Sequence, residues 1–208
     1  MKATWLLLTG MFLVAVVYLG HQQATQAEPA RTAQQQQSGA SHRLAENAQA
    51  KLDHIRENGE REQPDQTPTV LTEEEINDYF AAGKIQLPQG VKTVRLEGRS
   101  GVVTGFVNVD YEELRAGQKS TNPLLSMFNG RHDVQVEADA AGSGGVGKVH
   151  VRRVSMDGFD IPRIALEPFV QRFITAKYPN VGLDSEFKMP SRIDIATVGY
   201  HKLTVTQK

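Results

Sequence analysis

The chain has 208 residues, a formal net charge of -1 at pH 7 and no cysteine. The near-neutral charge gives no electrostatic basis for binding nucleic acid, so we expect no nucleic-acid partner. The lack of cysteine excludes a disulfide framework, thiolate catalysis and cysteine-based zinc sites. The fold must therefore be held together by its hydrophobic core.

The first twenty residues have the order of a bacterial export signal. Lys2 is followed by an almost unbroken apolar run over residues 5–19, and the small residues Ala24 and Ala27 come soon after. The pattern predicts that residues 1–27 are either a signal peptide cleaved after Ala27 or an uncleaved N-terminal apolar helix that anchors the chain in the membrane. In both cases we expect an exported protein of the cell envelope, periplasmic or extracellular.

Residues 28–69 are polar and rich in glutamine and proline, with no aromatic residue. Such a segment buries too little apolar surface to offset its ordering entropy, so we predict a disordered linker. Residues 44–56 are an exception, because alanines together with Leu44, Leu52 and Ile55 favour a transient helix. We favour a tether with some helical character over a partner-binding helix.

The folded domain is predicted to span residues 70–208. Residues 72–75, Thr-Glu-Glu-Glu, form a capping box that begins a short helix, and Gly83 ends it. Alternating polar and apolar residues then predict strands at 91–97, 102–110, 132–141 and 146–154, and near 183–187 and 193–206. Helical patterns occupy residues 123–128 and 163–178, and Pro168 kinks the second or marks its first turn.

Short turns join the neighbouring strands, which favours an antiparallel sheet over a parallel one. The predicted fold is therefore α+β, a strongly curved antiparallel sheet with two main helices packed across it, preceded by the N-terminal apolar helix and the disordered linker. The clearest hairpin surrounds a predicted four-residue turn at residues 142–145. In that register Asp139 faces Lys148 on the outside, and Ala138 faces Val149 on the inside.

The chemistry-bearing residues predict neither a catalytic nor a metal site. The three histidines of the domain lack metal-ligand spacing, and Ser155 lacks the glycine of a nucleophile elbow. The glycine-rich residues 142–147 lie between two strands and cannot open a helix onto a phosphate. For the basic ladder Lys148, His150 and Arg152, we favour pairing within the hairpin over attraction to anionic lipid head groups. We expect a non-enzymatic protein with no cofactor.

A curved sheet roofed by helices can leave a cleft on its concave side that accepts acyl chains. We expect this lipid groove to be lined by Leu124, Leu125, Phe128, Phe159, Phe169, Phe173 and Phe187. The expected partners are a lipid or amphiphile and the bacterial membrane surface. The alternative is a fully packed core, in which case the protein is an envelope scaffold or protein-interaction module with no small-molecule ligand.

Three short motifs carry a family resemblance. The run LTEEEIN at residues 71–77 resembles the start of the YpmS-like secreted proteins. The run VSMDGFDIP at residues 154–162, and FKMPSRI at 187–193, resemble both these proteins and the LmeA-like phospholipid-binding proteins. The resemblance implies an exported α+β domain related in shape to tubular lipid-binding folds, with a lipid held between a curved sheet and a helix. It implies no catalytic residues.

Overall fold

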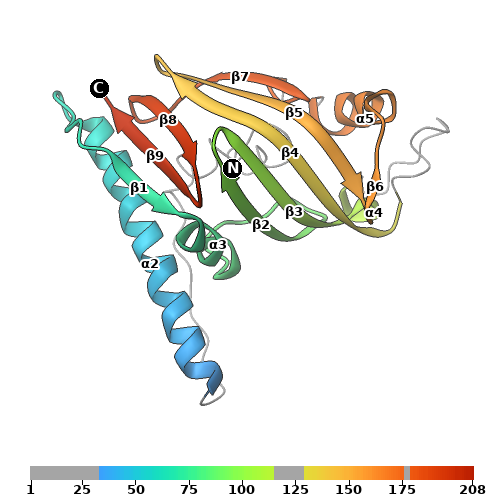
Figure 1. The fold of residues 1–208 in the computed structure, drawn as a ribbon, viewed down its shortest axis with the longest axis horizontal. Helices are drawn as coiled ribbons and strands as arrows, with labels where there is room; N and C mark the ends of the chain where they lie inside the picture. The colour runs from blue at the N-terminus through green and yellow to red at the C-terminus, as the bar shows by residue number, and fades with distance from the viewer. Residues whose placement is uncertain (1–32, 115–128, 176–178) are drawn as a thin grey trace.

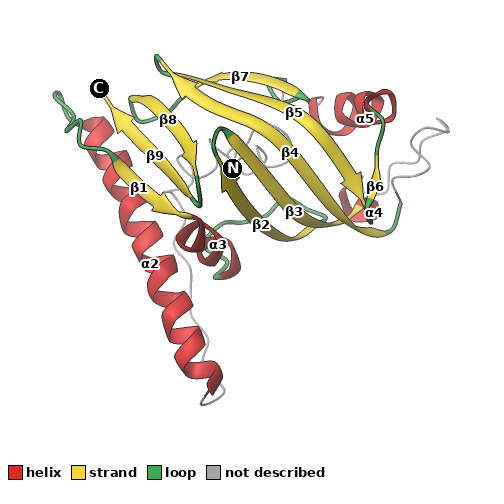
Figure 2. Ribbon diagram, viewed as in Figure 1, coloured by secondary structure: helices red, strands yellow, loops and turns green. Residues whose placement is uncertain are grey.

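The computed structural model describes residues 33–114, 129–175 and 179–208, without the side chains of residues 33–38 and 173. The fold is α+β, as predicted, and is built on a nine-stranded open sheet (Figures 1 and 2). The helices in these ranges are α2 (Ala33–Glu60), α3 (Glu73–Ala81), α4 (Tyr111–Leu114) and α5 (Arg163–Phe169), which continues into the π-helix η2 (Val170–Thr175).

All strand pairs in the sheet are antiparallel, which confirms the predicted sheet type. The strand order is β1-β9-β8-β4-β3-β2, and β5 lies along the other edge of β4 and carries β6 and β7. The strands are β1 (Thr69–Thr72), β2 (Val91–Arg99), β3 (Val102–Asp110), β4 (Arg131–Ser143), β5 (Val146–Met156), β6 (Phe159–Asp160), β7 (Asp184–Lys188), β8 (Ile193–Gly199) and β9 (Lys202–Gln207).

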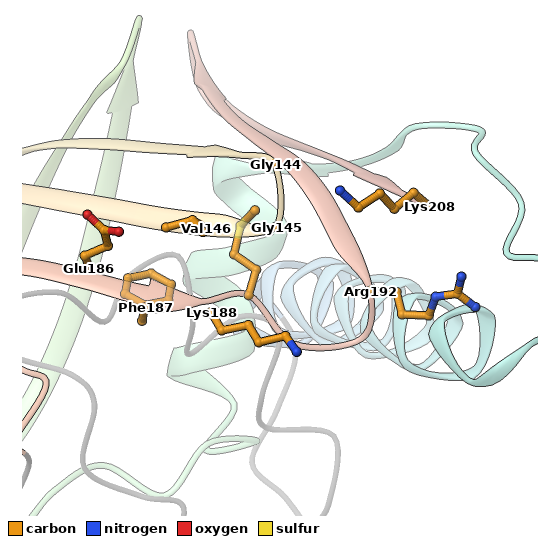
Figure 3. A pocket seen from close by; sticks show the side chains of 9 residues that line it. Gly144, Gly145, Val146, Glu186, Phe187, Lys188, Arg192 and Lys208 are labelled. Atoms are coloured by element: carbon orange, nitrogen blue, oxygen red, sulfur yellow. The ribbon is translucent and has the colours of Figure 1, made fainter.

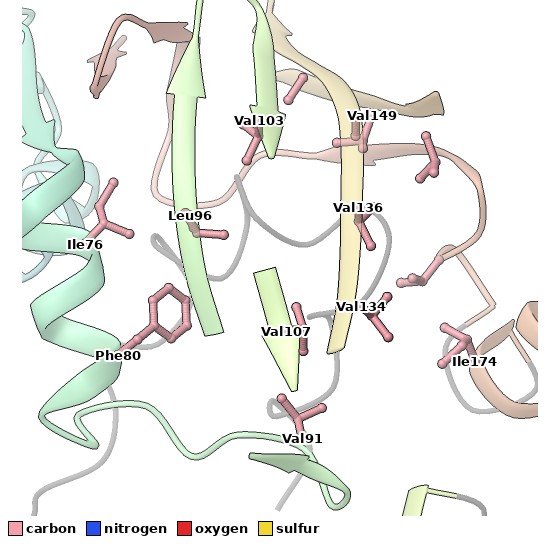
Figure 4. Close-up of a cluster of buried hydrophobic side chains, with 14 of the residues drawn as sticks. Ile76, Phe80, Val91, Leu96, Val103, Val107, Val134, Val136, Val149 and Ile174 are labelled. Atoms are coloured by element: carbon pink, nitrogen blue, oxygen red, sulfur yellow. The ribbon is translucent and has the colours of Figure 1, made fainter. Parts of the chain in front are cut away.

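The long strands have one buried face and one exposed face. On β4, Val134, Val136, Ala138 and Ala140 are buried, and the residues between them are polar and more exposed. We call the buried side of the sheet its inner face. Figure 4 shows Phe80 of α3 beside the side chains that β2, β3 and β4 contribute to this core.

The structure differs from the predicted disordered linker over residues 33–60, which form the helix α2. Ala45, Ala48, Leu52 and Ile55 are each almost fully buried, at the three- and four-residue spacing of one helix face. This stripe is thin in sequence, but alanine lets the helix approach its neighbours closely. The folded domain therefore begins well before residue 70.

A buried pair of amides fixes the C-terminal end of α2 on the sheet. The Asn58 amide donates to the Asp65 carbonyl at 2.8 Å and to Gln207 Oε1 at 2.9 Å. The Gln207 amide donates to the carbonyls of Ile55 and Ser191, at 2.6 Å each. Because both side chains are almost fully buried, these bonds hold the helix in one position relative to β9.

The β4–β5 hairpin differs from its predicted register. Gly144 and Gly145 both have positive φ, 62° and 79°, as the two central residues of a tight hairpin turn require. The turn therefore has two residues instead of four, and Val149 pairs with Ala140 instead of Ala138. The predicted cross-strand pairs are wrong for this reason.

The free edge of β2 is covered by side chains of α3. The Asn77 amide donates to the Leu96 carbonyl at 2.9 Å, and the Leu96 N–H donates back to Asn77 Oδ1 at 2.7 Å. The Gly98 N–H donates to Glu73 Oε2 at 2.8 Å. These bonds occupy backbone groups that would otherwise be open to pairing with another chain.

The predicted helix at 163–178 is two different elements over its described part. The α-helix ends at Phe169, directly after Pro168, and the π-helix η2 follows. Proline lacks the N–H of the α-helical bond and crowds the preceding turn, which explains the change of helix type. The predicted helical piece at 123–128 lies outside the described residues.

Within the ranges that the structure describes, no helix is long and apolar enough to cross a membrane. The predicted leader, residues 1–27, lies outside those ranges.

Candidate functional site

A pocket opens beside the β4–β5 turn. Its volume is about 670 Å³. Val146, Phe187 and Met189 give it an apolar wall, and Lys188, Arg192 and Lys208 stand around that wall (Figure 3). We call this site the hairpin pocket.

Two glycines make room for the apolar wall. Gly142 and Gly147 face each other across the hairpin. A Cβ atom on Gly147 would lie 2.4 Å from the Phe187 ring, and one on Gly142 would lie 2.5 Å from Met189 Sδ. Both distances are shorter than any ordinary contact of a Cβ atom. The glycine-rich run of the sequence therefore serves the packing of Phe187 and Met189 as well as the turn.

The hairpin pocket carries more positive than negative side chains. Lys188 has neither an ion pair nor a side-chain hydrogen bond among the described residues. Lys208 pairs with Asp194, and Glu186, the acidic residue of the lining, already pairs with Lys148 at 3.1 Å. The pocket therefore offers cationic groups beside an apolar wall.

The turn that carries Arg192 has an unusual backbone. Ser191 and Arg192 have φ of 51° and 54°, in the left-handed region that non-glycine residues seldom adopt. Arg192 Nη1 donates to the carbonyls of Arg61 and Glu62 at 2.9 and 3.1 Å, directly after α2. These bonds, with the Gln207 bond to Ser191, hold the turn in this conformation.

A second, much smaller hollow lies between the sheet and the helices α4, α5 and η2. Its volume is about 50 Å³, and its lining is apolar. Phe169 packs edge-to-face on Tyr111 there, with ring centroids 5.4 Å apart, and burial raises the pKa of Tyr111 well above its usual value. We call this hollow the inner cavity. Its lining includes Tyr111, Leu114, Val154, Leu166, Phe169 and Ile174.

Buried residues on the inner face of β5 lie between the two hollows. Gly147 lies under Phe187 of the hairpin pocket, Val154 lines the inner cavity, and Val149 and Val151 are buried between them. We call these four residues the β5 strip. At about 3.3 Å per residue, it spans roughly 23 Å.

The described residues of the predicted groove do not form one lining. Phe169 lines the inner cavity and Phe187 the hairpin pocket, at opposite ends of the β5 strip. Phe159 on β6 is 76 % exposed. Leu124, Leu125, Phe128 and the side chain of Phe173 lie outside the described part of the chain.

Sequence reasoning missed the cations of the hairpin pocket. Lys188 ends β7 and Met189 follows it, Arg192 precedes β8, and Lys208 follows β9. The one local signal was the run FKMPSRI at residues 187–193, in which two cations flank an apolar residue and a proline. Nothing in that run indicates that Lys208 joins it.

The basic ladder on the outer face of β5 is paired with acidic side chains, and Arg152 finds its partner within the hairpin, as favoured from the sequence. Arg152 binds Asp139, Lys148 binds Glu186, and His150 binds Asp184. Lys148 and His150 pair with β7, which lies along the other edge of β5, so the predicted pairing within the hairpin is wrong for these two residues.

His132 is held by a carboxylate as well. The hydrogen bond between His132 Nδ1 and Asp157 Oδ2, 2.5 Å long, raises the pKa of His132 and lowers that of Asp157. Over the residues described, no three histidine or acidic side chains gather as a metal site would require.

Comparison with known proteins found no matching family model, no matching curated protein and no matching solved structure. The resemblance to the YpmS-like and LmeA-like proteins therefore stays a prediction.

Proposed function

We propose that this chain is an exported, non-enzymatic protein of the cell envelope that binds a lipid or other amphiphile against the inner face of its curved sheet. The observation that carries the proposal is the β5 strip, a row of buried apolar residues between the hairpin pocket and the inner cavity. The sequence pattern of residues 1–27 supports export.

In this proposal, an acyl chain enters through the hairpin pocket and lies along the β5 strip. The volume of about 670 Å³ falls in the range of pockets that hold small molecules. The driving force is removal of the chain from water, which is worth about 0.8 kcal/mol per buried methylene. No group of the protein has to react.

The first test is to express the full chain with its N-terminal segment, extract the purified protein with organic solvent and analyse the extract by mass spectrometry. We expect a stoichiometric amphiphile. Its absence from several preparations, together with no binding of a fluorescent fatty acid, would overturn the proposal.

A second test compares fatty acids of increasing length on two variants of α5. Leu166 lines the inner cavity, whereas Ile164 on the same helix is 70 % exposed. Leu166→Phe should fill the cavity, so the longest fatty acid that binds well should become shorter by about two methylenes. The affinity for the original longest fatty acid should fall roughly tenfold. Ile164→Phe should leave the length profile unchanged. Equal profiles for both variants would exclude the inner cavity as the end of the path.

A second candidate function is an envelope scaffold or interaction module with a packed interior. The small volume of the inner cavity, about 50 Å³, favours it. For a scaffold we expect no extracted amphiphile and no fatty-acid binding, and both variants of α5 should bind as little as the unaltered protein.

A further inference from the structure

We propose that the hairpin pocket binds an oxyanion head group, a carboxylate or a phosphate, and so selects anionic amphiphiles. This inference rests on the proposed function, since it names the chemical class of the ligand at the entrance of the same path.

The charges of the hairpin pocket favour an anion. Lys188, Arg192 and Lys208 line it together with a single carboxylate, that of Glu186. Glu186 is engaged by Lys148 and Lys208 by Asp194, and both of these partners lie outside the lining. Lys188 and Arg192 are therefore the cations of the lining that have no carboxylate partner among the described residues. Ammonium and guanidinium groups bind carboxylate and phosphate oxygens by charge-assisted hydrogen bonds, which are stronger than bonds between neutral groups.

The three cations come from three separate segments that line one pocket. Lys188 ends β7, Arg192 lies in the turn before β8, and Lys208 extends from the end of β9 toward the hairpin turn at Gly144 (Figure 3). In the part of the chain that the structure covers, Lys188 has no acidic partner, so its ammonium group is free to meet a ligand.

The apolar wall sets the direction of the ligand. Met189 is buried over Gly142, and the Phe187 ring lies over Gly147, the first residue of the β5 strip. An apolar tail on the strip therefore passes Phe187, whereas its head group remains at the open side with the cations. A neutral head group would gain the apolar contacts but not the charge-assisted bonds.

The experiment compares cis-parinaric acid with its methyl ester, by fluorescence titration of the full chain at low and high salt. The two probes share one tail and differ in the charge of the head. We expect the acid to bind at least about fivefold more tightly at low salt, with the difference falling as salt screens the cations. The ester should show little salt dependence.

Lys188→Gln should weaken binding of the acid by roughly three- to fivefold and leave binding of the ester unchanged. Lys208 is not used for this test because its ammonium group pairs with Asp194. The matched control is Lys202→Gln, which removes the same charge from the other end of β9, outside the pocket lining. Arg192 is unsuitable for this test because it also binds the carbonyls of Arg61 and Glu62.

The outcomes separate the two proposals. Equal binding of acid and ester, or an unchanged Lys188→Gln variant, overturns the head-group site and leaves the amphiphile proposal standing. Binding of neither probe overturns the amphiphile proposal. A further arm titrates inorganic phosphate alone. If phosphate binds in a Lys188-dependent manner when neither probe does, the oxyanion source is a free anion and not a lipid head group.

Discussion

Substitution of Gly59 tests whether α2 is part of the folded domain. A Cβ atom at this position would lie 2.3 Å from the Ser191 carbonyl oxygen, whereas Cβ atoms essentially never come closer than 3.0 Å to a neighbour. The neighbouring atoms are backbone, so no side-chain rotation relieves the clash. Gly59→Ala must therefore separate α2 from the turn before β8 by roughly 0.7 Å.

The expected loss follows from what that separation disturbs. Overpacking of this kind costs about 1–3 kcal/mol. It also stretches the two 2.6 Å bonds that Gln207 makes to Ile55 and Ser191, each worth about 1 kcal/mol. Replacing glycine by alanine inside a helix stabilises the helix by up to about 1 kcal/mol, which offsets part of this loss. We expect a net destabilisation of about 2 kcal/mol and a fall in melting temperature of roughly 4–8 °C.

The same helix supplies the control. A Cβ atom added at Gly39 would have no neighbour within 4 Å, so Gly39→Ala should keep only the gain in helix propensity. Both variants are compared with the unaltered chain by thermal and urea denaturation. If Gly59→Ala is as stable as Gly39→Ala, then α2 does not pack on the turn before β8 and the reasoning is refuted.

Two further predictions concern stability. Asn77→Ala should lower the free energy of unfolding in urea by about 1–2 kcal/mol and increase light scattering when the protein is concentrated, because it uncovers the β2 edge. Asp78→Ala leaves the Asn77 bonds to the edge intact and should not aggregate. Equal scattering of the two variants would refute the role of Asn77 in covering the edge. The His132–Asp157 pair has a raised histidine pKa and a lowered carboxyl pKa, so its contribution is complete between about pH 4 and 6.5. This contribution is lost as pH rises through the folded pKa of His132 or falls through that of Asp157. The difference in the free energy of unfolding between the unaltered protein and His132→Gln should therefore shrink outside that window. A difference that does not depend on pH would contradict the prediction.

Local signals in the sequence predicted the elements whose bonds close within a few residues. The capping box is present as predicted, because the Thr72 side chain accepts from the Glu75 N–H at 3.2 Å and Glu75 Oε2 accepts from the Thr72 N–H at 2.9 Å. Gly83, expected to end that helix, has φ of 66° and donates to the Phe80 carbonyl.

Long-range contacts could not be predicted in the same way. The stability of α2 comes from a buried face in which two of the four residues are alanine, and from Asn58, whose partner Gln207 lies 149 residues away. The hairpin register depended on which two of several adjacent small residues form the turn, and the sequence alone left that open. The hairpin pocket needs Lys188 and Lys208 in one lining, which the antiparallel pairing of β7 with β5, of β8 with β4 and of β9 with β8 produces.

The turn before β8 serves both the position of α2 and the hairpin pocket. Arg192 lines the pocket and binds the chain at the end of α2, and Ser191 accepts the bond from Gln207. Loss of the α2 contact should therefore weaken amphiphile binding as well as stability, because the left-handed turn is held from the α2 side. Lys188→Gln, by contrast, should change binding and leave the melting temperature unaltered. Measuring both quantities on both variants separates residues that hold the pocket in shape from the residue that meets the head group.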